Sequence, residues 1–119
     1  MTKRTVRVNE LMHREISEIL HTRFQAETVG LTVTSVDVSP DLRQARIGYA
    51  VLGGADEVRR AEGFFRRYRG EVRRQLARRI VLKYLPELHF FRDDSPRKGQ
   101  DLLALMDEME EERARQDEE

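Results

Sequence analysis

The residues best suited to chemistry in this 119-residue chain are arginines concentrated in one stretch. From Arg59 to Lys83 there are ten basic residues against two acids, a local net charge of +8 in a chain whose formal net charge is zero. The guanidinium group is planar and always charged, and its fork of donors fits phosphate oxygens and stacks on nucleobases. An ordinary solvated helix face would interleave acids four residues from its basic side chains. The stretch therefore favours nucleic-acid binding.

The same stretch has the period of an amphipathic helix. At about 100° per residue, one arc of the first half is apolar and the opposite arc holds arginines. After Gly70 the apolar pattern restarts and continues to Tyr84. Glycine costs about 1 kcal/mol relative to alanine inside a helix and lets another backbone or a ligand come close. We therefore predict two helices over 55–85, joined by a kink at Gly70 and ended by Pro86.

Two basic groups stand in unusual places. Arg73 falls inside the second apolar arc, so we expect it to stand at the bend or to pair with a carboxylate, for which Asp94 is a candidate. Arg4 and Arg7 lie at the front of the first helix, where positive charge opposes the helix macrodipole. We predict an RNA-binding surface made of nine residues: Arg4, Arg7, Arg66, Arg67, Arg69, Gly70, Arg73, Arg74 and Arg78.

Other chemistries find little support. The chain has no cysteine, which excludes disulfides, thiolate metal sites and a catalytic thiol. His13, His21 and His89 lack the spacing of a metal site, and Asp93-Asp94 before Ser-Pro is typical of a turn. No glycine-rich phosphate loop or nucleophile elbow occurs. We expect a protein that is not an enzyme and that needs no cofactor or metal.

The remaining pattern predicts a single α+β domain. A helix is expected over 7–24, and β-branched residues predict strands over 31–39 and 44–52, joined by a Ser-Pro-Asp turn into an antiparallel hairpin. The apolar phase slips between Val33 and Val36, which indicates an irregularity. A third strand is expected over 88–92. The order is helix, strand, strand, helix, helix, strand, with the helices covering one face of the sheet.

The end of the chain is expected to differ from the rest. Beyond Gly99 the pattern predicts a short amphipathic helix, and residues 107–119 hold eight acids and two arginines, typical of a disordered tail. We place the domain at 1–106 and the acidic tail at 107–119. No stretch approaches the ~20 apolar residues of a membrane span. A monomeric cytoplasmic protein is the expectation.

Three runs give the chain a family resemblance: GEVRRQL at 70–76, LPELHFFRDDS at 85–95 and VTSVDVSPDL at 33–42. Together with RVNE at 7–10, they resemble bacterial ribosome-binding factor A. The resemblance implies a type II KH-like fold whose Gly-x-x-Gly loop is replaced by a kink with an Ala-x-Gly motif. The matching positions are Tyr68-Arg69-Gly70, so a tyrosine stands where the family has alanine. If the Tyr68 ring lies on the buried face, the joint between the two helices must be wider than in the family. If it points outward instead, it could stack on a base.

The resemblance also implies a function. A member of this family would bind the free small (30S) ribosomal subunit and promote late maturation of 16S ribosomal RNA, especially at its 5′ end and decoding region. It would act without catalysis, support growth in the cold, and be released with the help of a ribosome-associated GTPase. The residues alone leave two alternatives: a module that grips an acidic protein through its basic helices, and an enzyme that uses Asp93 and Asp94.

Overall fold

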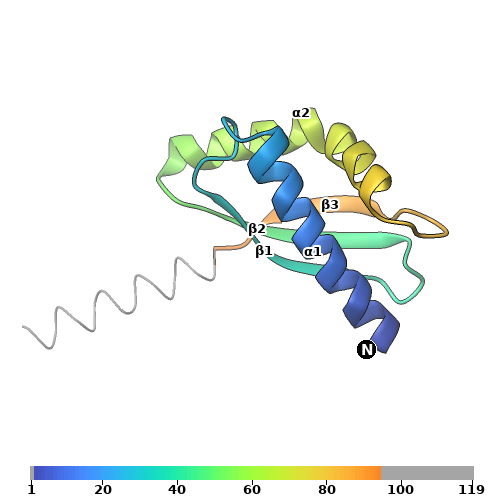
Figure 1. Ribbon diagram of the computed structural model, residues 1–119. Coiled ribbons are helices and arrows are strands. Elements are labelled where there is room, and N and C mark those ends of the chain that lie inside the picture. Colours follow the sequence, from blue (N-terminus) through green and yellow to red (C-terminus); the bar gives the residue numbers. More distant parts are fainter. Residues whose placement is uncertain (1, 95–119) are drawn as a thin grey trace, which may run out of the picture.

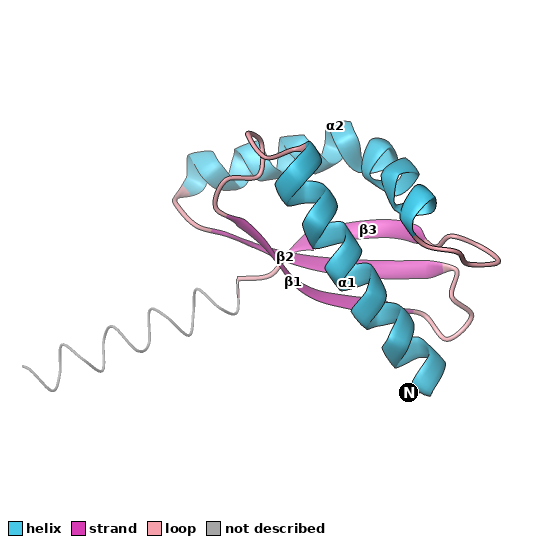
Figure 2. Cartoon of the chain, in the orientation of Figure 1, coloured by secondary structure: helices cyan, strands magenta, loops and turns pink. Residues whose placement is uncertain are grey.

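A computed structural model of the chain describes residues 2–94. Its elements follow the order α1, β1, β2, α2, β3, with both helices on one face of a three-stranded sheet (Figures 1 and 2). The α+β class and the antiparallel hairpin are confirmed. The helix expected beyond Gly99 and the acidic tail at 107–119 lie outside the described residues.

Helix α1 (Lys3–Arg23) begins four residues earlier than predicted. Thr2 is its N-cap, and the Thr2 hydroxyl oxygen accepts a hydrogen bond from the backbone N–H of Thr5 at 3.2 Å. Such a cap satisfies an amide that the first turn leaves without a partner. The buried stripe of α1 lies against the sheet and consists of Thr5, Val8, Met12, Ile16, Ile19 and Leu20.

The sheet has the order β1-β2-β3. Strand β1 (Leu31–Val38) pairs antiparallel with β2 (Gln44–Val51), and β3 (Glu87–Arg92) pairs parallel with β2. The register of β1 shifts between Val33 and Ser35, so Thr34 is an extra residue in that strand. The predicted phase slip is thus a β-bulge, which keeps Val33, Val36 and Val38 on the helix-covered face.

Helix α2 (Ala55–Arg79) is a single helix of 25 residues that continues through Gly70. The prediction of two helices divided at Gly70 is therefore wrong, although the second half of α2 turns down towards β3 in Figure 1. A Cβ atom added at Gly70 would meet no atom within 4 Å, and the positive-φ glycines of the described chain are Gly30 and Gly53. Nothing at Gly70 requires glycine for the fold.

Helix α2 also ends earlier than predicted, at Arg79 rather than near Leu85. Ile80 is extended (φ −124°, ψ 146°), and the β-branched pair Ile80-Val81 has a low helix propensity. Residues 80–86 instead run back to β3 as an irregular segment. Tyr84, expected in the buried arc, has 62% of its surface exposed, and Val81 is fully exposed.

The core lies between the sheet and the two helices. Its aromatic part comes from the first half of α2, where Phe65 stacks on Phe90 of β3 with ring centroids 4.2 Å apart. Phe64 packs edge-on against Phe24 at 5.2 Å. On the other face of the sheet, Arg46 lies over the ring of Phe91. The burial of Ala61, Phe64, Phe65, Val72 and Leu76 confirms the predicted inner face of α2.

Candidate nucleic-acid interface

The arginines of α2 occupy its solvent face. The six that were predicted are all exposed: Arg66, Arg67, Arg69, Arg73, Arg74 and Arg78. The arginines of α2 form two rows, and within each row the members are seven residues apart. One row is Arg59, Arg66 and Arg73, and the other is Arg60, Arg67 and Arg74. Seven residues make 700°, 20° short of two turns, so each row runs almost parallel to the helix axis, with about 10.5 Å between members.

A row of small residues runs between the two arginine rows. It has the same seven-residue spacing and consists of Gly63, Gly70 and Ala77. The positions of both glycines are open, because an added Cβ would meet nothing within 4 Å. Long cationic side chains therefore flank a strip where a ligand can approach the helix backbone. We call this surface, the two arginine rows with the small residues between them, the arginine face.

Several guanidinium groups of α2 are left available, although Arg59 of the first row pairs with Asp56. Among the described residues, Arg66, Arg69 and Arg78 have no side-chain partner, and Arg67 lies over the ring of Tyr68 at 5.2 Å. Arg74 pairs with Glu71 at 2.7 Å but keeps 74% of its side chain exposed. An exposed pair one turn apart contributes only a few tenths of a kcal/mol, so it can open to accept a ligand.

Arg79 has structural partners instead. It is about one-quarter exposed and pairs with Glu18 at 3.0 Å and Glu15 at 3.4 Å on α1. The hydrogen bonds that Arg79 donates to these carboxylates, that to Glu18 first, raise the pKa of Arg79. This cluster joins the two helices, which explains why Arg79 does not belong to the open face.

Arg73 is held differently from either expectation. Its guanidinium donates to the main-chain carbonyls of Leu85, at 2.8 Å, and Pro86, at 3.2 Å. These carbonyls, rather than the carboxylate of Asp94, hold the side chain, and α2 continues through this point instead of ending at a joint between two helices. Its position at one edge of the arginine face lets it fix the segment that leads into β3.

The structure separates Arg4 and Arg7 from the other predicted residues. Both are exposed in the first turns of α1. Helix α1 contacts α2 through its second half, around Glu15 and Phe24. Eleven residues of helix, about 16 Å, separate Arg4 from that contact. Figure 1 shows the start of α1 at the far end from the N-terminal half of α2. Arg4 borders the 80–86 segment instead and meets it at a shared pocket.

The structure adds residues that the sequence did not single out. Arg60 lines a hollow of about 360 Å³ with Gly63, Arg67 and Tyr68, beside the first half of the arginine face. Its seven-residue spacing from Arg67 and Arg74 was a signal available in the sequence. Tyr84 and Lys83 are the other additions, and no periodicity could have revealed them, because their segment is not helical.

Comparison with known proteins gives a consistent result. The family model of ribosome-binding factor A matches residues 4–106. A protein of that name from Opitutus terrae is 44% identical over 110 residues, covering 92% of this chain and 90% of its own length. A second, from Thioalkalivibrio sulfidiphilus, is 37% identical and covers 87% of this chain and 81% of its own.

The chain belongs to the ribosome-binding factor A family.

Solved structures of ribosome-binding factor A share its fold. The crystal structure of the protein from Thermus thermophilus superimposes with a TM-score of 0.63 over 74% of this chain and 94% of its own, at 22% identity. The solution structure of a protein from Thermotoga maritima, described as a ribosome-binding factor A candidate, gives 0.59 over 73% and 88%, at 24% identity. The type II KH-like fold implied by the resemblance is confirmed.

Tyr68 shows how this member of the ribosome-binding factor A family accommodates a tyrosine at the family's alanine position. The ring is half-buried and packs against Phe24 and Phe64, with centroids 5.3 Å from each. Neither predicted solution is needed, because the helix is continuous and there is no joint to widen. The tyrosine extends the aromatic core to the surface, where Arg67 covers it.

Ribosome-binding factor A proteins are non-catalytic ribosome-binding factors, and two histidines of this chain, His13 and His21, have structural roles. The Nε2 atoms of His13 and His21 donate to the carbonyls of Val33, at 3.0 Å, and Leu31, at 2.8 Å. Asn9 accepts from the N–H of Val38 at 2.9 Å. Side chains of α1 thus satisfy main-chain groups along β1, an edge strand. Within residues 2–94 no cluster of His, Cys, Asp or Glu could hold a metal.

Asp93, one of the two aspartates proposed for an enzyme, serves the fold. Asp93 accepts a hydrogen bond from the Thr34 hydroxyl at 3.2 Å, and its own N–H donates to the Tyr49 carbonyl at 2.7 Å. It thereby ties the end of β3 to the bulge of β1.

No helix in the described part of the chain is long and apolar enough to span a membrane.

Proposed function

We propose that this chain binds the free small (30S) ribosomal subunit through the arginine face of α2 and supports late maturation and 5′-end processing of 16S ribosomal RNA. Family membership supports this proposal, since the ribosome-binding factor A of Thermus thermophilus has been fitted into the electron-microscopy map of a 30S complex. That protein's fold matches this chain with a TM-score of 0.59, over 72% of this chain and 91% of its own, at 22% identity.

The observation that carries the proposal is the arrangement of charge on α2. Six arginines in two parallel rows border a strip of glycine and alanine, so cations can reach phosphates on both sides of a backbone lying along the helix. The wider RNA surface takes in Arg69, Gly70 and Arg78, with Arg4 and Arg7 as a separate second contact. Binding of this kind needs no catalytic group and no cofactor.

The first test is co-sedimentation with purified small subunits, large subunits and joined ribosomes over a salt series. We expect selective binding to the small subunit. If about five arginines neutralise phosphates, the slope of log K against log salt is roughly −3.5 to −4.5. Equal binding to all three particles would reduce the protein to a general polyanion binder and refute the proposal.

A charge-matched pair of variants tests where the interface lies. Arg74→Glu with Arg78→Glu should abolish subunit binding without unfolding the chain. The control, Arg14→Glu with Arg23→Glu on α1, makes the same change in net charge. Arg14 matches Arg74 closely, since their side chains are 73% and 74% exposed and each faces a glutamate. A folded Arg74/Arg78 variant that binds normally would refute this placement.

Two further partners follow from the proposal. A ribosome-associated GTPase would release the bound, monomeric protein in the cytoplasm. An acidic protein is the rival partner, because the guanidinium fork fits carboxylates as well as phosphates. Ribonuclease digestion of the subunits separates the two. Loss of binding favours RNA as the ligand, and binding that survives digestion favours the acidic protein.

A further inference from the structure

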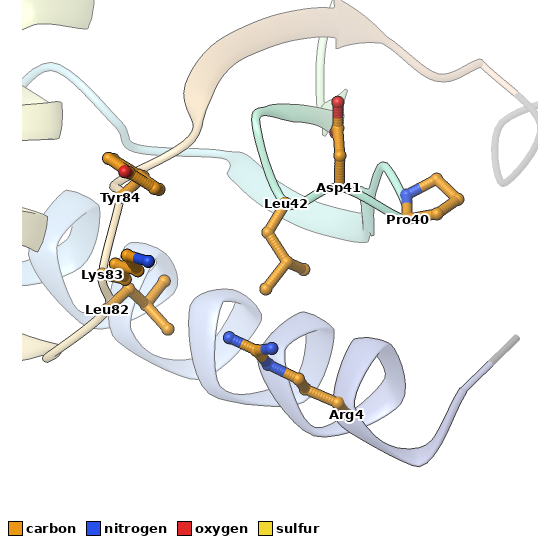
Figure 3. Close-up of a pocket in the computed structure, with 7 residues that line it drawn as sticks. All are labelled: Arg4, Pro40, Asp41, Leu42, Leu82, Lys83 and Tyr84. Carbon is orange, nitrogen blue, oxygen red and sulfur yellow. The ribbon is translucent and has the colours of Figure 1, made fainter.

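A pocket lies at the end of the molecule opposite the start of α2. It has a volume of about 290 Å³ and is lined by the first turn of α1, the turn between β1 and β2, and residues 80–86 (Figure 3). These three segments are far apart in the sequence. The lining residues are Arg4, Pro40, Asp41, Leu42, Leu82, Lys83 and Tyr84.

The pocket combines an aromatic ring, two cations and an apolar floor. The Tyr84 ring is 62% exposed, so much of its surface is free for stacking. The Lys83 ammonium lies 5.6 Å from the ring centroid. Figure 3 shows the Leu42 side chain and the Arg4 guanidinium extending into the space between the segments, with Leu82 beside Lys83. Aromatic stacking beside positive charge is the usual way in which proteins hold unpaired nucleotides.

The one carboxylate of the lining does not cancel these charges. Asp41 accepts hydrogen bonds from the Ser39 hydroxyl, at 2.6 Å, and the Arg43 N–H, at 3.1 Å. The bond from Ser39, followed by that from Arg43, holds the pKa of Asp41 below its ordinary value of 3.8. Figure 3 shows the carboxylate pointing away from Arg4. Asp41 therefore stays ionised but is bonded within its own turn, and Arg4 and Lys83 leave the lining with a net charge of +1.

Three locally unfavourable features meet at this pocket. Leu42 has a φ of +61°, a left-handed conformation that strains a residue with a side chain. Arg4 stands in a first helical turn that has no acid, where its charge opposes the macrodipole. Tyr84 and its neighbours leave apolar surface in water. Costs of this kind gather where a chain serves binding rather than stability.

We propose that this pocket is a subsite for one unpaired RNA nucleotide, whose base stacks on Tyr84 above Leu42 and Leu82 and whose phosphate meets Arg4 and Lys83. The volume suits one base, because pockets for small molecules begin at about 300 Å³. The subsite rests on the proposed function, since it adds a base contact to the phosphate contacts of α2. Arg73 connects the two surfaces through its hydrogen bonds to the carbonyls of Leu85 and Pro86.

The test uses the full chain with three variants in and near the pocket. Tyr84→Leu removes the aromatic ring, Tyr84→Phe keeps it, and Val81→Ala alters a fully exposed apolar residue of the same segment that does not line the pocket. The probes are a short single-stranded oligoadenylate, a duplex RNA of equal length and purified small subunits. Since Tyr84 is mostly exposed, we expect all three variants to keep the parental melting temperature, which is checked first.

We expect Tyr84→Leu to weaken oligoadenylate binding by about 5- to 140-fold, the range for loss of one base–aromatic stack. Subunit affinity should fall in the same variant. Tyr84→Phe and Val81→Ala should bind both probes normally, and the duplex should bind all proteins alike. Unchanged oligoadenylate binding by Tyr84→Leu would overturn the subsite. Loss of subunit binding alone would also overturn it, because the ring would then contact a ribosomal protein.

The same measurements separate this inference from the proposed function. If the Arg74/Arg78 variant loses subunit binding while Tyr84→Leu binds both probes normally, the arginine face stands and the nucleotide subsite is refuted. If the Arg74/Arg78 variant binds subunits normally, the proposed interface fails. The oligoadenylate result then still decides whether the pocket holds a base.

Discussion

Replacing Gly70 by alanine should stabilise this protein, and the size of the effect follows from the geometry of α2. The residue lies inside a continuous helix, it is exposed, and an added Cβ would meet nothing within 4 Å. Alanine in such a site stabilises by roughly 0.5–1 kcal/mol, since glycine loses more backbone freedom on folding. For a domain of this length the gain corresponds to a rise in Tm of about 2–5 °C.

Gly63 is the matched control. It occupies the same row, two helical turns earlier, and its Cβ position is equally open. Gly63→Ala should therefore give the same gain. The two substitutions lie about 10.5 Å apart and share no partner, so their effects should add in the double variant. Thermal and urea unfolding, followed by far-ultraviolet circular dichroism in one buffer, measure the stability of all three variants.

The opposite result would refute this account of α2. If Gly70→Ala destabilises while Gly63→Ala stabilises, the chain needs glycine at position 70, as a kinked joint between two helices would require. Leucine at Gly70 extends the comparison to binding. It keeps the helix stable but fills the strip between the arginine rows, so small-subunit affinity should fall while Tm does not.

Three further outcomes are expected. Gly48→Ala should destabilise the folded chain by about 1–3 kcal/mol in urea unfolding, because the new Cβ would lie 2.6 Å from the Ser35 hydroxyl oxygen and 3.0 Å from the Phe91 ring. A neutral result would contradict this packing. Arg79→Ala should lower Tm slightly, by an amount that shrinks as salt rises, and leave subunit binding intact; weaker binding would place Arg79 in the interface. The pKa of Asp41 is lower in the folded chain than its ordinary value of 3.8, so its contribution to stability is complete above pH 3.8 and is lost as pH falls through the pKa of the folded state. Asp41→Asn should therefore flatten the acid end of the curve of stability against pH. An unchanged curve would mean that Asp41 titrates normally.

The sequence predicted the fold well wherever one face of an element is buried. Strand positions alternated with a period of two, and even the slip between Val33 and Val36 proved to be a real bulge at Thr34. The aromatic inner face of α2 followed from a period of 3.6. In both cases burial imposes the periodicity on the sequence, so the pattern can be read without knowing the neighbours.

Predictions about the joint and the end of α2 failed for a physical reason. Glycine at position 70 is compatible both with a break between two helices and with one continuous helix that leaves the position open, and only the tertiary structure separates the two. The end of α2 at Arg79 depends on Arg73 holding the carbonyls of Leu85 and Pro86 and on Ile80 adopting an extended conformation. These are contacts between residues whose partners no local pattern specifies.

The sequence alone determined that this chain is an α+β domain with an arginine-rich helix, because charge and hydrophobic period are properties of the residues themselves. Only the tertiary structure decided which arginines are available. Arg79 pairs with Glu15 and Glu18 across the helices, whereas Arg66 and Arg78 remain open among the described residues. It also brought Arg4, Leu42 and Tyr84 to one pocket. Such groupings arise from packing between distant segments, which is why no spacing in the sequence could reveal them.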